Sequence, residues 1–366
     1  MKKYYVNGTL VLVLIVLFAG ANKTADLFEG FETGTPEIKS MSSLTFGPEG
    51  ILFIGDTRNA AVFAVETGDT SPGEAPQRIN ISNFDRLVAE SLGTDVKNID
   101  IQDMAVNPIS KKLYFSVHTN DGSAVLLKLE GEKLAAVKLS DIRYSTTGLH
   151  NAPGEGEVDD RGRSKRIWSI SDLNYFNDQV MITGISNQEF GSSFRSIPFP
   201  FQDSQSMSSL EIYHGNHGRY ETNSPVRTFI PTEIKGEKYI VASYTCTPLV
   251  LFPLNELKPG KHVKGRTVGE FGYGNAPLDM IIMPKDGKNY LVMNNSNRPV
   301  MIIDMDKLAS YEGALTEPVE YIAGVEHTTM PWVNVLQLDK VNDNQFVMLQ
   351  RRSNGNLDLW SASPRW

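Results

Sequence analysis

The stretch Ser43-Leu-Thr-Phe-Gly-Pro-Glu-Gly-Ile-Leu-Phe-Ile-Gly-Asp56-Thr-Arg-Asn-Ala-Ala-Val-Phe-Ala-Val65 carries the plan on which the chain is built. A polar residue opens a short apolar strand, a turn containing Gly and Pro follows, and a second polar turn then separates two strongly apolar strands. Val, Ile and Phe favour strands, whereas Gly, Pro, Asp and Asn favour turns. The stretch therefore predicts three consecutive antiparallel strands joined by two tight turns.

The same plan recurs along the rest of the chain. The later copies occupy residues 103–129, 172–197, 232–252, 279–304 and 334–360. Repeats spaced by roughly 45 to 70 residues are typical of propeller blades of four strands with loops of variable length. We therefore expect an all-β protein, with residues 41–366 forming a single β-propeller domain of six blades. Residues 70–98 and 140–165 are weakly patterned, so a seventh blade is the alternative, and residues 84–92 are the best helix candidate.

The N-terminus has the layout of a secretory signal peptide. Lys2 and Lys3 precede an apolar run over residues 9–18, and Ala19-Gly20-Ala21 offers a cleavage site. We expect residues 1–21 to be removed, which makes the mature protein secreted or periplasmic with no stable membrane span; an uncleaved anchor is the alternative. Residues 22–40 form an N-terminal segment, in which a strand within residues 33–39 is expected to close the ring by completing the last blade.

Composition excludes some classes of partner and of enzyme. The formal net charge of −8 argues against a nucleic-acid partner, because phosphate binding needs a basic surface. The sequence contains no G-x-S-x-G, P-loop, HExxH or CxxCH motif. A small molecule or a protein therefore remains as the partner, and whether the chain is an enzyme stays open.

Polar residues open the first strand of each repeat. They are Ser43, Asp103, Asp172, Thr232, Asp279 and Asn334. Since the first strands of propeller blades line the central channel, these side chains are expected to meet at one mouth. Aspartates that converge repel one another, so Asp103, Asp172, Asp279 and Asn334 form a candidate axial site for a cation such as calcium. The alternative is that each residue bonds neighbouring backbone N–H groups.

The segment Glu211-Ile-Tyr-His-Gly-Asn-His-Gly-Arg-Tyr-Glu-Thr-Asn-Ser-Pro-Val-Arg-Thr228 is an unusual loop between the third and fourth repeats. His214 and His217 lie in a Gly-rich turn, and Cys246, the single cysteine, lies at the hairpin tip of the next repeat. Two imidazoles and a thiolate suit copper or zinc. The alternative is that the histidines bond backbone carbonyls while Cys246 is a small buried apolar residue.

Further ligand-binding candidates lie at hairpin tips and in the same loop. They are His118, Arg219, Arg227, Arg351 and Arg352. His118 stands where the first repeat has Asp56, and an arginine can hold a carboxylate or phosphate. Exposed side chains without a ligand are the alternative.

Residues 50–59 and the apolar strand after them resemble NHL-type and gluconolactonase-like propeller repeats, and Asp279-Met280 with Asp286-Gly-Lys-Asn-Tyr-Leu-Val292 resembles a YVTN-type repeat. Propellers of these kinds include lactonases, lyases, binding modules and scaffolds, so the resemblance implies an architecture without fixing an activity. The sequence departs from the gluconolactonase pattern, because its first repeat does not open on a glutamate.

Three functions stay open at this point. The first is an exported propeller that binds a ligand or partner outside the cytoplasm. The second is a metalloenzyme, either a hydrolase or an oxidoreductase, with its site in residues 211–228. The third is a lactonase-like hydrolase with a cation at the central channel.

Overall fold

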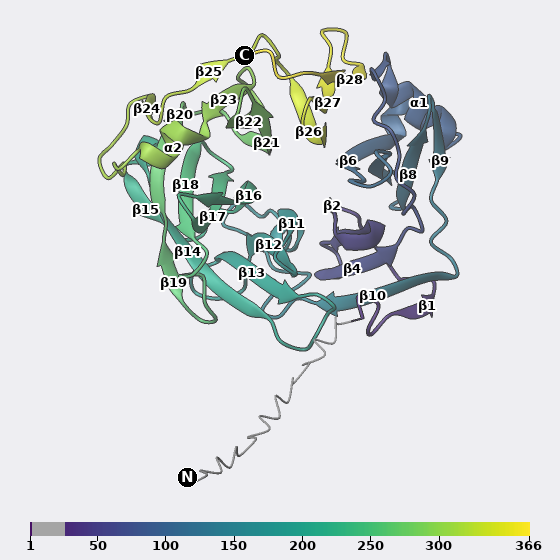
Figure 1. The fold of residues 1–366 in the computed structure, drawn as a ribbon, viewed down its shortest axis with the longest axis horizontal. Coiled ribbons are helices and arrows are strands. Elements are labelled where there is room, and N and C mark those ends of the chain that lie inside the picture. Colours follow the sequence, from purple (N-terminus) through teal and green to yellow (C-terminus); the bar gives the residue numbers. More distant parts are fainter. Residues whose placement is uncertain (2–25) are drawn as a thin grey trace.

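The computed structural model describes Met1 and residues 26–366, so the expected signal peptide and its cleavage site lie outside the described residues apart from Met1. The described strands form six sheets, which stand around a common centre as the blades of a propeller (Figure 1). This confirms the predicted six-bladed β-propeller. Within the described residues, no helix is long and apolar enough to cross a membrane.

Each blade begins with three consecutive antiparallel strands, as the repeats predict, and its first strand is innermost. For blades 1 to 3 these strands are β2 (Ser43–Phe46), β3 (Ile51–Asp56) and β4 (Ala61–Glu66); β6 (Ile99–Val106), β7 (Leu113–Thr119) and β8 (Ala124–Glu130); and β11 (Asp172–Phe176), β12 (Gln179–Ile185) and β13 (Ser192–Pro198). For blades 4 to 6 they are β16 (Val226–Ile234), β17 (Glu237–Tyr244) and β18 (Pro248–Pro253); β21 (Pro277–Lys285), β22 (Lys288–Asn295) and β23 (Met301–Asp304); and β26 (Val335–Asn342), β27 (Gln345–Arg351) and β28 (Leu357–Ala362).

The outer strands come from several parts of the chain. They are β10 (Ile142–Gly148) and β1 (Glu32–Gly34) in blade 1; β9 (Lys133–Ala136) in blade 2; β14 (Ser206–His214), β15 (Arg219–Glu221) and β19 (His262–Lys264) in blade 3; β20 (Arg266–Phe271) and β24 (Ile322–Gly324) in blade 4; β25 (Thr328–Thr329) in blade 5; and β5 (Asn80–Ile81) in blade 6. The helices are α1 (Phe84–Ser91), which confirms the helix candidate, α2 (Met305–Ser310), and the short η1 (Pro48–Gly50), η2 (Val96–Asn98), η3 (Arg166–Trp168) and η4 (Gly215–His217).

The blades do not follow one another around the ring in sequence order. The inner strand β2 of blade 1 lies between β6 of blade 2 and β11 of blade 3, and β6 lies next to β26 of blade 6. Between β4 and β10 the chain leaves blade 1, adds β5 to blade 6 and builds blade 2 before it returns (Figure 1). Blade 2 is thus inserted between two strands of blade 1.

Ring closure therefore differs from the expectation. The N-terminal strand β1 pairs with β10 at the outer edge of blade 1, with Thr33 opposite Arg143. The last blade is completed by β5, where Ile81 lies opposite Leu359 of β28. The prediction that residues 33–39 complete the last blade is wrong, because the outer edge of β28 is paired with β5, from the segment that follows β4. Residues 70–98 and 140–165 hold β5, α1 and β10 instead of a seventh blade.

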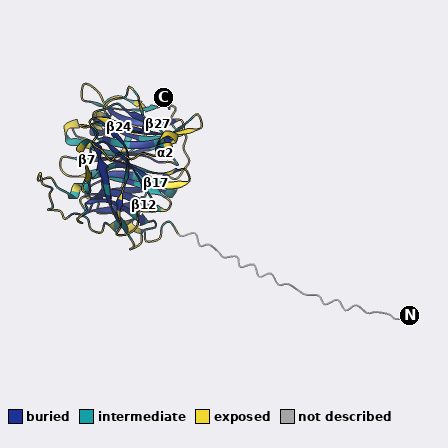
Figure 2. Ribbon diagram, turned by 90° about the vertical axis from the view of Figure 1, so that its left-hand side faces the viewer, coloured by how far each residue is buried: buried dark blue, intermediate teal, exposed yellow. Residues whose placement is uncertain are grey.

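The core consists of apolar clusters between neighbouring blades, and the buried strands fill the interior of the disc (Figure 2). Between blades 1 and 3, the fully buried ring of Phe53 stacks on Tyr175 at 5.5 Å between centroids and meets the edge of Phe199 at 4.8 Å. Burying one such side chain stabilises a fold by roughly 1.5–3 kcal/mol. Because only one cysteine is present, this packing holds the ring without an intramolecular disulfide.

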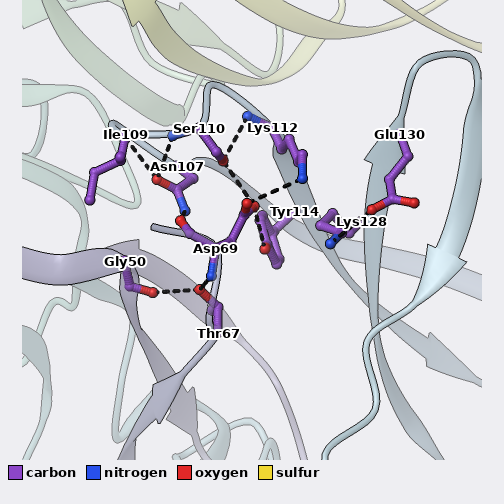
Figure 3. A network of polar contacts seen from close by, with 10 residues as sticks. All are labelled: Gly50, Thr67, Asp69, Asn107, Ile109, Ser110, Lys112, Tyr114, Lys128 and Glu130. Atoms are coloured by element: carbon purple, nitrogen blue, oxygen red, sulfur yellow. Dashed lines mark hydrogen bonds and ion pairs between the residues drawn. The ribbon is translucent and has the colours of Figure 1, made fainter. Parts of the chain in front are cut away.

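A polar network secures the segment that leaves blade 1 against blade 2 (Figure 3). The buried Asp69 carboxylate accepts hydrogen bonds from Ser110 Oγ at 2.8 Å and Tyr114 Oη at 2.9 Å, and pairs with Lys112 Nζ at 3.2 Å. Burial alone would raise the pKa of Asp69, but these partners lower it below its ordinary value. The network thus fixes the point at which the chain departs from blade 1.

Candidate functional site

Four aspartates on inner strands surround the central channel: Asp103, Asp172, Asp279 and Asp339. One oxygen of each carboxylate accepts the N–H of the next residue in its own strand. The other oxygen accepts an N–H from the neighbouring blade: Leu44 to Asp103 at 2.7 Å, Phe229 to Asp172 at 3.0 Å, Leu338 to Asp279 at 3.1 Å and Val106 to Asp339 at 2.6 Å. The carboxylates therefore tie adjacent inner strands together.

The channel shifts the pKa of every one of these carboxyls upward. Burial raises the pKa of Asp103 to about 8, and the charges of Asp172 and Asp339 add to the rise. Burial likewise raises the pKa of Asp172 and of Asp339 to about 6. The pKa of Asp279 lies well above its ordinary value, through burial and the charges of Asp103 and Asp172.

The structure places three of the four predicted axial residues together. Asp103, Asp172 and Asp279 line a cavity of 490 Å³ on one side of the ring and a cavity of 420 Å³ on the other. Asn334 lies exposed in the turn before β26 and lines neither cavity. Asp339 takes the corresponding place in blade 6, five positions after Asn334. Sequence reasoning missed it because the sixth repeat aligns on the polar residue at its first position, which lies in the turn before β26.

Thr232 of blade 4 is displaced in the same way. It pairs with Tyr239 near the far end of β16, whereas Thr228, four positions earlier, lines the cavity of 420 Å³. A bulge between Val226 and Thr228 directly precedes the residue that lines the cavity, as it does at Asp103 and Asp279.

The predicted His-His-Cys group is brought together on the outer part of blades 3 and 4. One ligand atom each from His214, His217 and Cys246 lies within 4.8 Å of the others. His214 ends β14, His217 closes the short helix η4, and Cys246 lies in the turn between β17 and β18. Within the described part of the chain, this is the one group of three or more His, Cys, Asp or Glu side chains with such spacing.

A shared carboxylate orients both histidines. Glu221 accepts at Oε2 from His214 Nδ1 at 3.1 Å and at Oε1 from His217 Nδ1 at 2.6 Å. The imidazole rings lie 3.8 Å apart between centroids. His214 is 1% exposed, and its Nε2 has no hydrogen-bond partner. With each Nδ1 directed at Glu221, the Nε2 atoms are the ones left to bind a metal.

Electrostatics at this group follow from the same contacts. Burial would lower the pKa of His214, but contacts with Cys246 and Glu221 and the charge of Glu270 raise it to about 9. Burial would raise the pKa of Glu221, but hydrogen bonds from His214, Ser224 and His217 hold it far below its usual range. Glu221 was missed as a site residue, although its position four residues after His217 in the same loop was a usable signal.

A second buried carboxylate joins the two segments that carry the ligands. Glu270 on β20 accepts the Gly215 N–H at 2.6 Å through Oε1 and the Thr247 hydroxyl at 2.7 Å through Oε2. Gly215 follows His214 directly, and Thr247 follows Cys246. A side chain at Gly215 would meet Val319 at 2.8 Å, so the turn needs glycine there.

The other predicted ligand residues separate into two groups. His118 and Arg227 line the cavity of 420 Å³, and His118 Nε2 accepts the Met41 N–H at 3.0 Å. Arg219 contacts Glu221 at 3.3 Å, Arg352 pairs with Asp358 at 2.6 Å, and Arg351 is exposed at its hairpin tip. Of these five residues, only His118 and Arg227 therefore line a common cavity.

Fold and site together define a six-bladed β-propeller with a lined central channel and a His-His-Cys group at its periphery. The sequence matches none of the protein-family profiles and none of the curated proteins with which it was compared.

Several solved structures are similar to this chain at low sequence identity. A protein of Thermus thermophilus described as an oxidoreductase (glucose dehydrogenase) is 12% identical, with 91% of this chain and 99% of that chain covered, and has a TM-score of 0.33. A bifunctional GH43-CE protein of Bacteroides eggerthii is 15% identical over 74% of this chain and 33% of its own, with a TM-score of 0.40. Raptor of Chaetomium thermophilum is 9% identical over 92% of this chain and 26% of its own, with a TM-score of 0.33.

Proposed function

We propose that this chain is an exported β-propeller that binds one copper or zinc ion through His214, His217 and Cys246. The observation that carries the proposal is the shared Glu221, which holds Nδ1 of both histidines and leaves the buried His214 Nε2 without a partner beside Cys246. A carboxylate behind a metal-binding histidine fixes the ring and its tautomer.

The ligand chemistry selects the kind of metal. Two imidazole nitrogens and a thiolate sulfur suit copper or zinc, whereas calcium takes oxygen ligands. The channel aspartates are a weaker candidate for the metal, because both oxygens of each carboxylate already accept backbone N–H groups.

The proposed ion would have three protein ligands and remain within reach of solvent. The His217 side chain is 43% exposed and Cys246 is half-buried. Three ligands with an accessible further position are typical of metal sites that bind a substrate or activate water. Export is supported by the signal-peptide pattern of residues 1–21.

The test is metal content after loading the purified protein with Cu²⁺ or Zn²⁺ and removing excess metal, measured by elemental mass spectrometry. We expect one equivalent in the native protein and loss of binding in His217→Ala and Cys246→Ser. His262→Ala is the matched control, because His262 also bonds a carboxylate, Glu211 at 2.7 Å, away from the site. If the native protein retains less than one equivalent of copper and also less than one equivalent of zinc, the proposal is refuted.

A further inference from the structure

The cavity of 420 Å³ at the end of the channel nearest His118 is here called the channel-mouth pocket. Trp168, Arg227, Thr228 and Gln337 line it together with Asp103, Asp172 and Asp279. Its volume lies within the range of about 300–1,000 Å³ found for small-molecule sites. It is separate from the His-His-Cys group, since none of those three residues lines it.

Two residues that line this pocket each carry a buried oxygen without a partner. Gln337 is 8% exposed and Thr228 is 2% exposed, and neither Gln337 Oε1 nor Thr228 Oγ1 makes a hydrogen bond. The Thr228 hydroxyl lies near enough to Asp172 to lower the pKa of that carboxyl, but it lacks a partner in hydrogen-bonding geometry. The Gln337 amide is held in place because its Nε2 donates to Gln102 O at 2.8 Å. Buried polar atoms are nearly always paired, so two such atoms in one pocket point to a ligand that carries hydrogen-bond donors.

Trp168 and Arg227 supply the pocket with an aromatic ring and a hydrogen-bond donor. The guanidinium carbon of Arg227 lies 5.8 Å from the centroid of the Trp168 ring. Within the described residues Arg227 makes no ion pair, although its charge offsets part of the rise that burial causes in the pKa of Asp172. The pocket therefore combines an indole ring, a guanidinium donor and acceptor oxygens.

The charges around the pocket favour an uncharged ligand. An anion would meet the Asp103, Asp172 and Asp279 carboxyls, whose pKa values are raised chiefly by burial, which already disfavours negative charge there. A metal cation would have to compete with the backbone N–H groups on those carboxylates and would face Arg58 and Arg227, which both line the pocket. A sugar ring is uncharged and so avoids both conflicts. Its hydroxyls donate and accept hydrogen bonds, and its C–H face can lie on an indole ring.

We propose that the channel-mouth pocket binds an uncharged polyhydroxylated molecule of monosaccharide size, with its ring on Trp168 and its hydroxyls paired with Gln337 Oε1, Thr228 Oγ1 and Arg227. This site is independent of the metal site, so either proposal can fail while the other holds.

The experiment titrates the full chain with D-glucose, D-galactose, D-xylose and myo-inositol by isothermal calorimetry, with saturation-transfer NMR to detect weak binding. We expect saturable binding of at least one of the four. Trp168→Leu should weaken it about tenfold or more, and Thr228→Val about threefold to tenfold. Thr228→Val preserves shape and removes only an unpaired hydroxyl, so the variant should fold.

Ser116→Ala is the matched control, because the Ser116 hydroxyl is also buried and unpaired but does not line the pocket. It should bind the sugar as the native protein does. Three results would overturn the proposal: no saturable binding of any of the four compounds, equal weakening in Ser116→Ala and Thr228→Val, or binding of citrate or Ca²⁺ in place of the sugars.

Discussion

Asp339 of blade 6 accepts a hydrogen bond of 2.6 Å from the backbone N–H of Val106 in blade 2, although the two residues are 233 positions apart. The same kind of bond links blades 2 and 1, 3 and 4, and 5 and 6 through the other channel aspartates. The buried carboxylates therefore help to set which inner strands are neighbours.

Replacing Asp339 should destabilise the ring. In Asp339→Ala the N–H groups of Val106 and Lys340 lose their acceptor. A buried donor left unpaired costs roughly 1–3 kcal/mol, so we expect the free energy of unfolding in urea to fall by about 2–3 kcal/mol. Asn334→Gly is the control, since Asn334 is exposed with a φ of 56° that glycine tolerates. An unchanged unfolding midpoint in Asp339→Ala would contradict the bridging role.

The raised pKa values make stability depend on pH in a defined direction. A carboxyl whose pKa is higher in the folded state favours folding when it is protonated, and this contribution is lost as the pH rises through the folded pKa. Since those values are about 6 for Asp172 and Asp339 and about 8 for Asp103, against an unfolded value of about 4, the melting temperature should fall between about pH 4 and about pH 8.

Calorimetric melting of the native protein and of Asp103→Asn across this range checks the assignment. The variant cannot lose the proton in question, so its curve should be flatter between about pH 4 and about pH 8. Parallel curves for the two proteins would exclude Asp103 as a source of the dependence.

Asp69 should show the opposite dependence on pH. Its pKa is lowered by Ser110, Tyr114 and Lys112, so its contribution is complete above the unfolded value of about 4 and is lost as the pH falls through the folded pKa. At neutral pH we expect Asp69→Asn to lower the free energy of unfolding by about 1–3 kcal/mol. The exposed Asp141→Asn is the control, and urea denaturation of both variants at neutral and acidic pH is the measurement.

Glu221 should support metal binding without contacting the metal. Glu221→Gln weakens the acceptor that holds Nδ1 of both histidines, and loss of such a partner typically reduces metal affinity about 10-fold to 100-fold. Competition with a chromogenic chelator measures the affinity. Glu211→Gln makes the same change beside His262 and should leave the affinity unaltered. Equal affinities for native protein and Glu221→Gln would show that the carboxylate does not orient the ligands.

The sequence predicts what depends on local patterns. The six repeats, the helix after Asn83 and the proximity of Cys246 to His214 follow from strand periodicity, turn residues and order along the chain. The residue of an inner strand that faces the channel is harder to predict from sequence, because several polar residues compete for that position and bulges are common in these strands. In blades 4 and 6 the polar residue that opens the repeat is therefore the wrong one, and Thr228 and Asp339 line the channel cavities in place of Thr232 and Asn334.

The order of the blades could not be read from the repeats. Each repeat predicts its own three strands, but the choice of neighbour rests on contacts between distant segments, such as Ile79 N–H with Ser361 Oγ at 2.9 Å. The pairing of β5 with β28 involves two residues of β5, too short a stretch to carry a periodic signal.

The insertion of blade 2 into blade 1 affects how the chain can fold while it is being synthesised. A propeller that emerges blade by blade could complete each sheet as its residues leave the ribosome, whereas blade 1 here must wait for β10 before its fourth strand is present. The pairing of β5 with β28 forms later still, because Ile79 and its partner Ser361 are separated by 282 residues. In the early half of the nascent chain, β5 thus stays unpaired until nearly the whole polypeptide has emerged, a state that favours assistance by a chaperone before the ring closes.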